Sequence, residues 1–365
     1  MSQASTFSTT ELPHDSPAGG LLGMAERRWL PDTLVRMGIR RLCAARLREE
    51  AARSHQSEAF ARDMDLLRQS PIAVHTDDAN QQHYELPTEF FRRCLGPRLK
   101  YSACYYPTGG ETLAEAEEAM LALCAARADL ADGQQILELG CGWGSMTLWM
   151  AQRFPTARIT AVSNSRSQRE FILTRCQEYG LKNVQVVTCD INHLQMPAGS
   201  FDRCVSIEMF EHLRNYETLL ARISSWLRPD GKLFVHIFCH RVLMYPFEAQ
   251  GEDNWLGCHF FTGGIMPAAD TLLWFQQHLT LEQRWLVSGS HYQRTAEDWL
   301  KNQDENGEAI MPVLESTYGE AAKLWLQRWR MFWMACAELF GYADGREWLV
   351  AHYRFAKSGG HERWE

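Results

Sequence analysis

Closely spaced glycines between a predicted strand and a predicted helix constrain the fold of this chain more than any other feature. They lie in the segment Glu138-Leu-Gly140-Cys-Gly142-Trp-Gly144-Ser145, which follows an apolar stretch at 136–139 and opens a helical pattern at 144–154. Glycines at such a turn let the backbone pass close to a ligand and point amide N–H groups toward it. Taken alone, they are also compatible with a tight turn that binds nothing. In a βαβ context they predict a ligand crevice at the end of the first strand.

The spacing of these glycines indicates which ligand sites are excluded. A dinucleotide site requires G-x-G-x-x-G and an acidic residue at the end of the second strand. Here Ser145 stands at the third glycine position, and the second predicted strand ends in the uncharged pair Ser163-Asn164. No Gly-Lys-Ser/Thr follows the glycines, as a phosphate-binding P-loop would require. The spacing therefore disfavours both an NAD site and a P-loop.

Strand-like and helical patterns alternate along the chain. Short strands alternating with 10–15-residue helices predict βαβ units and a parallel sheet, so the expected fold class is α/β. A capping box, Thr112-x-x-Glu115, and a turn, Pro229-Asp-Gly231, mark the start of one helix and of the fifth strand. The expected strands are 136–139, 158–163, 184–189, 201–207, 233–238, 281–288 and 347–356. The expected helices after residue 112 are 113–128, 144–154, 168–178, 296–304 and 320–340.

Charge and cysteine usage exclude several classes of protein. The chain carries 37 Lys+Arg against 45 Asp+Glu, a net charge of −8, so it has no global basic field and no nucleic-acid partner is expected. No apolar stretch approaches the ~18 residues of a transmembrane helix, and no basic residue precedes Arg27, so neither stable membrane insertion nor a leader peptide is expected. The 11 cysteines include no C-x-x-C pair. We therefore expect no metal site, no disulfide framework and a cytoplasmic location.

Five segments together carry a resemblance to a known family. They are Leu99-Lys-Tyr-Ser102, Ile136-Leu-Glu-Leu-Gly-Cys-Gly-Trp-Gly-Ser145, Ser163-Asn-Ser-Arg-Ser-Gln168, Asp190-Ile191 and Glu208-Met-Phe-Glu-His212. From about Tyr84 onward the chain resembles the S-adenosylmethionine-dependent methyltransferases, in the branch of cyclopropane-fatty-acid synthases, mycolic acid cyclopropane synthases and coclaurine-type N-methyltransferases. The coclaurine type is the most similar, through Arg214-Asn-Tyr216, Trp329-Arg-Met-Phe332 and Glu338-Leu-Phe-Gly-Tyr342. The resemblance implies a seven-stranded, mostly parallel Rossmann-like sheet with helices on both faces, and S-adenosylmethionine as the cofactor.

The resemblance also implies which residues contact the cofactor. Glycine amides can bind the methionine carboxylate, Asn164 or Gln168 can bond the ribose hydroxyls, and Asp190 can accept from the adenine amino group. The carboxyl ends of strands are where open α/β sheets bind ligands. The implied contacts are Tyr101, Ser102, Gly140, Gly142, Asn164, Gln168, Asp190, Ile191 and Ile207.

Four regions are expected along the chain. Residues 1–20, rich in Ser, Thr, Pro and Gly, are predicted to be a disordered tail. Residues 21–111 are predicted to form a helical region that covers the cofactor site, with helices over 29–69 and near Pro87. The Rossmann-like core is expected at 112–245. Residues 246–365 are expected to supply an irregular lid at 251–264, the substrate-pocket helices and the final strands.

Three residues after the fourth predicted strand are the candidates for the chemistry. If the chain turns helical there, Glu208, Glu211 and His212 share one face. An amine acceptor is protonated at neutral pH, so a carboxylate can orient the cation while Glu or His takes its proton. An imidazole of ordinary pKa would titrate close to neutrality. The alternative interpretation is a helix N-terminus whose acids only complement the dipole.

The substrate pocket has two interpretations, which follow the two branches of the family. An aromatic stripe at helical spacing, Trp325, Trp329 and Trp333 with Phe332, is compatible with a packed core, but the coclaurine-type pattern favours Trp329 and Phe332 as pocket lining. The leading hypothesis is N-methylation of a small amine, by an enzyme for which both a monomer and a homodimer are compatible with the sequence. The alternative is a cyclopropane synthase, in which a bound bicarbonate acts as base. The positions that match its site in this chain are Ala103, Glu211, His236 and Tyr292.

Overall fold

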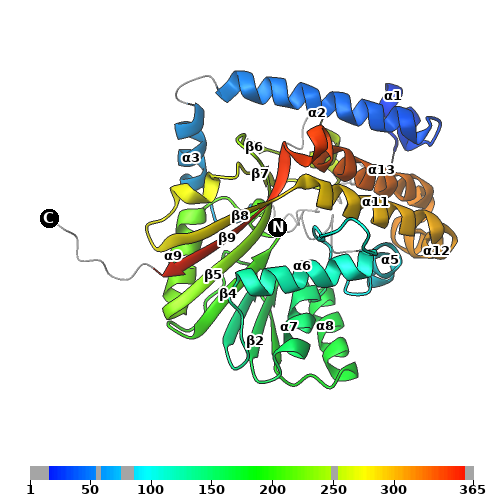
Figure 1. Cartoon of the computed structure of the whole chain (residues 1–365). Coiled ribbons are helices and arrows are strands. Elements are labelled where there is room, and N and C mark those ends of the chain that lie inside the picture. Colours follow the sequence, from blue (N-terminus) through cyan, green and yellow to red (C-terminus); the bar gives the residue numbers. More distant parts are fainter. Residues whose placement is uncertain (1–15, 55–58, 75–85, 248–253, 358–365) are drawn as a thin grey trace, which may run out of the picture.

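A seven-stranded sheet forms the centre of the fold, and a group of helices lies above it in Figure 1. The computed structural model describes residues 16–54, 59–74, 86–247 and 254–357. The strand order is β3-β2-β1-β4-β5-β9-β8, and β9 runs antiparallel to both of its neighbours. The predicted seven-stranded, mostly parallel Rossmann-like sheet is therefore confirmed.

The strands are short and buried on both faces where helices cover them. In β1, for example, Ile136 packs into the core on one face and Leu137 into the core on the other, as expected for a parallel strand between two helical layers. The strands of the large sheet are β1 Gln135–Leu139, β2 Arg158–Ser163, β3 Val184–Thr188, β4 Phe201–Ile207, β5 Leu227–His240, β8 Leu279–Val287 and β9 Trp348–Lys357. A separate pair consists of β6 Tyr245–Pro246 and β7 Ile265–Met266.

The strand order reverses between β1 and β4. These two strands are parallel neighbours, with Leu139 paired to Ser206. The glycine loop leaves β1 and Glu208 follows β4, so both segments emerge side by side at the same edge of the sheet. Such a switch point is where open α/β sheets bind their ligands.

Helices cover both faces of the sheet (Figure 1). On one face α9 Tyr216–Trp226 packs with α3 Ala59–Gln69 in a core that contains Leu137 and Val235. The other face carries α6 Leu113–Arg127, α7 Ser145–Arg153 and α8 Arg166–Glu178. The capping box that begins α6 at Thr112 and Glu115 is formed as predicted.

The helices above the sheet pack mainly on α13. Arg36 of α2 joins α11 and α13, since its guanidinium lies 2.6 Å from Glu297 and 2.9 Å from Glu338. These helices are α1 Gly20–Glu26, α2 Asp32–Ser54, α5 Thr88–Cys94, α10 Trp255–His259, α11 Gly289–Glu305, α12 Gly307–Tyr318 and α13 Ala322–Phe340. Single turns are η1 Phe210–His212, η3 Thr271–Trp274, η4 Gly319–Ala321 and η5 Tyr342–Gly345.

Several elements differ between prediction and structure; for example, the helix expected at 296–304 already begins at Gly289 in α11. The helix expected at 29–69 is two helices, α2 and α3, separated by residues 55–58, which lie outside the described residues. The turn expected at Pro229–Gly231 is an irregularity within β5, because Leu227 pairs with Phe201 and Lys232 already pairs with Arg203. Helix α12 was not predicted, since Pro312 lies inside it and proline removes a helical hydrogen bond.

Two further expectations fall partly on residues that are not described. Most of the predicted tail, 1–15, lies outside the described residues, but Pro17 and Ala18 are half-buried, and the amide of Ala18 donates to Glu26 over 2.7 Å. In the segment expected to be an irregular lid, 251–253 lie outside the described residues and 255–259 form α10.

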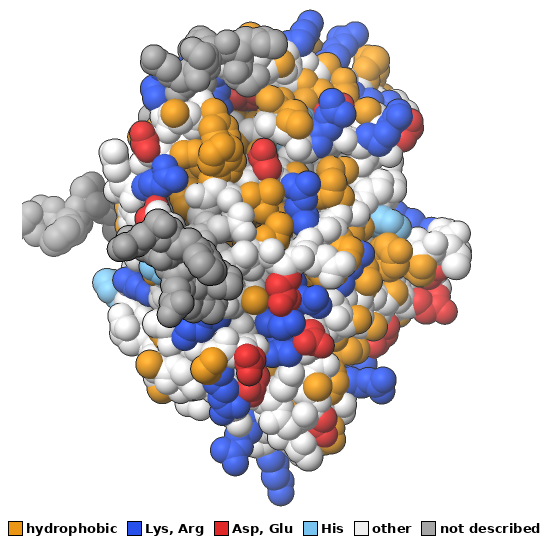
Figure 2. Space-filling model, turned by 60° about the vertical axis from the view of Figure 1, so that its left-hand side comes forward, with side chains coloured by type: hydrophobic (Ala, Val, Ile, Leu, Met, Phe, Trp, Pro, Cys, Tyr) orange, Lys and Arg blue, Asp and Glu red, His pale blue; other side chains and the backbone are white. Residues whose placement is uncertain are grey.

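The surface is mixed in charge. On the face shown in Figure 2, basic and acidic side chains are interspersed, and hydrophobic side chains lie between them. Among the helices of the described segments, none combines the length and the apolar character needed to cross a bilayer.

Candidate active site

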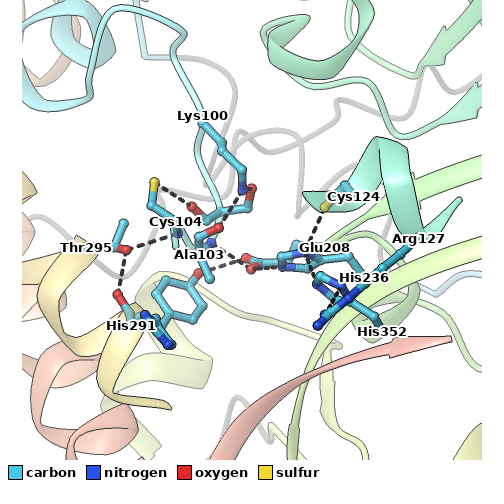
Figure 3. Close-up of polar contacts among 12 residues, drawn as sticks. Lys100, Ala103, Cys104, Cys124, Arg127, Glu208, His236, His291, Thr295 and His352 are labelled. Atoms are coloured by element: carbon cyan, nitrogen blue, oxygen red, sulfur yellow. Dashed lines mark hydrogen bonds and ion pairs between the residues drawn. The ribbon is translucent and has the colours of Figure 1, made fainter. Parts of the chain in front are cut away.

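Glu208 lies at the carboxyl end of β4 and is held by three donors (Figure 3). Its Oε1 accepts from the amide of Ala103 over 2.9 Å and lies 3.0 Å from Nε2 of His236. Its Oε2 accepts from the hydroxyl of Tyr292 over 2.8 Å. Burial raises the pKa of Glu208, and the charge of Lys100 with the bonds from Ala103 and Tyr292 partly offsets that rise.

The backbone of Glu208 is strained. Its φ of 46° falls in the left-handed region, which residues with a side chain rarely adopt. The strain is sustained by contacts on both sides of the residue, since its amide also donates to the carbonyl of His236 over 2.8 Å. A strained residue held in this way is typical of functional sites.

Glu211 is a second buried carboxyl beside Glu208, and it is not satisfied. Its side chain is fully buried, yet neither carboxylate oxygen has a hydrogen bond of ordinary geometry from any residue that the structure describes. Burial and the charge of Glu208 raise its pKa well above the usual range. Of the two carboxyls, Glu211 is therefore the more readily protonated while no cation lies beside it, and the three donors keep Glu208 as the acceptor.

His212 completes the group of three candidates. Its ring packs 4.6 Å from the ring of Phe261, measured between centroids. Burial lowers the pKa of His212 to about 4, and the negative charge of Glu208 offsets this lowering only in part. The imidazole is therefore neutral near pH 7, and the expected titration close to neutrality is wrong. The helical face predicted for the trio is also wrong, because only Phe210–His212 forms a turn, of the 3-10 type.

The three side chains nonetheless line one cavity. It encloses about 750 Å³ of space outside protein atoms, a volume that includes open solvent at its mouth. Apart from Glu208, Glu211 and His212 the lining is apolar, and most of it is aromatic. The aromatic members are Tyr101, Phe238, Phe247, Phe261, Tyr292, Trp299, Phe332 and Phe340.

Two hollows meet this cavity at Glu208, which lines all three spaces. Gly140 and Gly142 line both hollows. The first hollow also includes Asn164, Gln168 and Ile191 of the expected cofactor contacts, together with Ala73, Val74 and Met209. The second includes Tyr101, Ser102 and Ile207, together with Trp143 and Ser145.

Several polar atoms in these hollows fit a nucleotide-like ligand. The Nε2 of buried Gln168 and the Oγ of Ser145 have no hydrogen-bond partner among the described residues. Gly142 has φ +51°, and a Cβ built there would meet no atom within 4 Å, so its backbone borders open space. Burial raises the pKa of Glu138 to about 8, and its carboxyl accepts from Thr147. The residues present therefore fit the cofactor that the resemblance implies.

Three predicted site residues are placed differently by the structure. Asp190 does not line either hollow, and its Oδ1 accepts from the amide of Asn192 over 2.7 Å. Trp329 is fully buried one turn beyond the cavity, where Phe90 and Phe91 pack against it, so it is a core residue rather than pocket lining. His236 also lies outside the cavity lining, because it supports Glu208 from the sheet side.

Other site residues were missed by the sequence analysis. Trp143, Ser145 and Met209 lie inside motifs that had been singled out, so their positions were a usable signal. Ala73 lies in a segment without a motif, and Phe261 lies in the expected lid, 251–264, where no motif marked it individually.

The chain matches a known protein family over most of its length. Residues 73–345 match the family model described as mycolic acid cyclopropane synthetase. The chain belongs to this family. An (S)-coclaurine N-methyltransferase of Thalictrum flavum subsp. glaucum is 40% identical to this chain over 346 residues, 92% of this chain and 95% of that protein. The cyclopropane-fatty-acyl-phospholipid synthase of Escherichia coli (strain K12) is 27% identical over 281 residues, 76% of this chain and 68% of that protein.

A solved structure agrees with the fold. It is coclaurine N-methyltransferase bound to N-methylheliamine and SAH, with a TM-score of 0.87 and 39% identity. The match covers 92% of this chain and 99% of that one. The structure of the cyclopropane synthase MmaA2 from Mycobacterium tuberculosis, 24% identical with a TM-score of 0.66, shares the fold.

Proposed function

We propose that this protein is an S-adenosylmethionine-dependent N-methyltransferase whose acceptor is a small amine carrying an aromatic ring. The observation that carries the proposal is the carboxyl of Glu211, which is buried, accepts no hydrogen bond of ordinary geometry from the described residues and lines an aromatic cavity. A buried carboxylate without a partner is costly unless a cation pairs with it. A protonated amine supplies that cation.

The cavity can bind such an amine through its charge and through its ring. Tyr292 and Phe332 present aromatic groups to the cavity, and aromatic faces attract a cation within ~6 Å. The same rings pack against an aromatic substituent. The similarity to coclaurine N-methyltransferases supports this substrate class.

The buried acids and His212 can prepare the amine for reaction. An ammonium group has no lone pair, so it must lose a proton before it can attack. The raised pKa of Glu211 brings its proton affinity closer to that of an amine, which favours the transfer. Glu208 keeps a negative charge beside the site, and neutral His212 can accept a hydrogen bond from the nitrogen. These roles explain why two carboxyls of different state lie together.

The cofactor is S-adenosylmethionine, which supplies the methyl group as an electrophile. Gly140, Gly142 and the unpaired Nε2 of Gln168 are the groups that would hold it. Lys100 lines the second hollow. Its Nζ donates to the carbonyl of Ala103 over 2.6 Å and so fixes the 100–103 segment.

The structure weakens the cyclopropane-synthase alternative. The positions expected to hold bicarbonate include the amide of Ala103, His236 and Tyr292, and all three donate to Glu208 instead. The carboxylate of Glu208 therefore already uses the donors that a bound anion would need.

Three broader expectations belong to this proposal. A cytoplasmic location is supported by the free state of all eleven cysteines. The division into regions 1–20, 21–111, 112–245 and 246–365 is supported by the segments that line the spaces around Glu208, which are 73–74 and 99–102 from the second region and parts of α11 and α13 from the fourth. A homodimer stays a prediction.

The function is tested by a methyl-transfer assay with labelled S-adenosylmethionine. The panel contains an aromatic secondary amine, its oxygen analogue, an aromatic thiol and vesicles of unsaturated phospholipid. We expect label in the amine and none in its oxygen analogue or the lipid. Label in the lipid without label in any amine would overturn the proposal.

Cofactor binding gives a separate prediction. Gly142→Val is expected to abolish measurable binding of S-adenosylmethionine in a calorimetric titration, because the side chain would enter the open hollow from a strained φ. Gly180→Val is the matched control: Gly180 has φ +66°, and a Cβ there also meets no atom within 4 Å, but it lies outside both hollows. Equal loss of affinity in both variants would show that backbone strain, not the hollow, is responsible.

A further inference from the structure

A row of hydrogen bonds leads from Glu208 through two histidines to the end of α6 (Figure 3). His236 Nε2 lies 3.0 Å from Oε1 of Glu208, and its Nδ1 lies 2.9 Å from Nε2 of His352. His352 Nδ1 lies 2.8 Å from Nη1 of Arg127. The two histidines are directly opposite each other on β5 and β9, and α6 covers this face of the sheet. Four residues far apart in the sequence thus form one continuous chain of contacts.

Arg127 determines the direction of every bond in this row. A guanidinium group has donors only, so His352 must accept through Nδ1 and carry its hydrogen on Nε2. His352 then donates to Nδ1 of His236, which must carry its hydrogen on Nε2 and donate to Glu208. Burial lowers the pKa of both histidines well below the usual value, so each is neutral and has a single ring hydrogen. The row therefore has one orientation, with its last donor aimed at Glu208.

We propose that Arg127 and His352 are positioning residues that act through His236 to hold Oε1 of Glu208 as a hydrogen-bond acceptor and so keep Glu208 a carboxylate. The proposal deepens the proposed function and rests on it for the role of Glu208. The row cannot carry a proton away from the site, because a guanidinium has no lone pair to receive one. The row holds Glu208 in the carboxylate state and does not conduct protons.

The cost of protonating Glu208 at Oε1 follows from the balance of hydrogens. A new O–H on Oε1 must donate to Nε2 of His236, whose hydrogen then has to reside on Nδ1. His352 must in turn move its hydrogen from Nε2 to Nδ1. The net change is uptake of one proton, and the row ends with an N–H of His352 pointing at an N–H of Arg127. Arg127 therefore opposes the inverted row, while the Tyr292 hydroxyl bears only on Oε2.

A metal site is the other chemistry that these groups could support. Cys124, His236 and His352 offer ligand atoms that all lie within 4.8 Å of one another. A metal would need the facing nitrogens, Nδ1 of His236 and Nε2 of His352, to be free of hydrogen. The hydrogen of His352 would then sit on Nδ1, against Arg127. The thiol of Cys124 also has its pKa raised to about 12 by burial, so it is a weak donor toward His236 rather than a thiolate ligand.

Other titratable groups face Glu208 and must be unchanged in the test. They come from each element packed around it, and of these only the Cys124 thiol also feels the charge of Arg127, which lowers its pKa. They are Lys100 and Cys104 of the 99–104 segment, Cys124 of α6, Glu211 and His212 of η1, Tyr292 of α11 and Cys336 of α13.

The test compares Arg127→Met with Arg127→Lys in the full-length enzyme. Two-bond ¹⁵N–¹H spectra of ¹⁵N-histidine-labelled protein report which ring nitrogen carries the hydrogen, and they need no turnover. In the parent and in Arg127→Lys we expect His236 and His352 with hydrogen on Nε2 from pH 6 to 8. In Arg127→Met we expect hydrogen on Nδ1 in a population that grows as the pH falls. We also expect amine turnover about tenfold lower at pH 7, from the lost charged donor, with unchanged cofactor affinity.

Several results would overturn the proposal that Arg127 and His352 hold Glu208 as a carboxylate. Hydrogen on Nδ1 of either histidine in the parent contradicts the direction of the row. Parent tautomers and parent turnover in Arg127→Met contradict the role of Arg127. Zinc-induced shifts of both histidines at stoichiometric zinc would favour the metal site instead. Absence of amine turnover in the parent contradicts the proposed function. The tautomer spectra still decide whether Arg127 sets the direction of the hydrogen bonds to Glu208.

Discussion

Replacement of Glu211 by Gln is expected to lower amine turnover by ~10²–10⁴-fold at neutral pH, the range typical of a lost general base. Gln keeps the shape of the side chain but can neither pair with an ammonium group nor take its proton. The loss should be large because the site is buried and aromatic, so no water replaces the carboxylate. The rate is measured with labelled S-adenosylmethionine at saturating amine.

Two comparisons make this result specific. Glu305→Gln changes an exposed Glu of α11 outside the cavity and should leave the rate unchanged. Cofactor affinity of the Glu211 variant, from calorimetry, should also be close to that of the parent, because Glu211 lines the aromatic cavity and neither hollow. Parent turnover in Glu211→Gln would show that this buried acid is structural.

Replacement of Glu208 by Gln is expected to lower turnover by ~10²-fold, for a different reason. Glu208 accepts from Ala103, His236 and Tyr292, so the substitution removes a charge that three donors stabilise. A neutral amide also brings its own N–H₂ toward these donors, and an unmatched buried donor costs ~1–3 kcal/mol. We expect a lower unfolding temperature together with the loss of rate.

The Glu208 result separates a charge effect from a loss of fold. Tyr292→Phe removes one donor while the charge remains, and its unfolding temperature provides the comparison. If Glu208→Gln keeps parent turnover while its unfolding temperature falls as in Tyr292→Phe, the residue serves the fold alone and the proposed electrostatic role is wrong.

Local patterns predicted the parts of the fold that depend on local chemistry. The glycine loop, the capping box at Thr112 and the alternation of strands and helices all follow from neighbouring residues. Helix α12 could not be predicted in this way, because burial of Ile310 and Leu314 outweighs the local penalty of Pro312. The irregularity at 228–231 depends on pairing with β4, which the sequence of β5 does not contain.

In the candidate site too, the features that depend on neighbouring residues were predicted and those that depend on distant contacts were not. Glu208, Glu211 and His212 were found because they are close in sequence, although the helical reason for grouping them was wrong. The partners of Glu208 come from segments more than 25 residues away, so neither the Ala103 bond nor the histidine row could be inferred from spacing. Trp329 was misplaced because its helical stripe continues beyond the end of the cavity.

The dependence of kcat/KM on pH, in the parent and in Glu211→Gln, tests the central claim most directly. In the parent, the rate should rise through the raised pKa of Glu211, above the usual range of a Glu, and then stay level until the pKa of the amine. The level region is expected because the enzyme binds the ammonium ion and removes its proton. Glu211→Gln can use only the neutral amine, so its rate should increase about tenfold per pH unit up to the amine pKa. If the two pH profiles are parallel and Glu211→Gln keeps the level region of the parent, the assignment of Glu211 as the group that accepts the proton is contradicted.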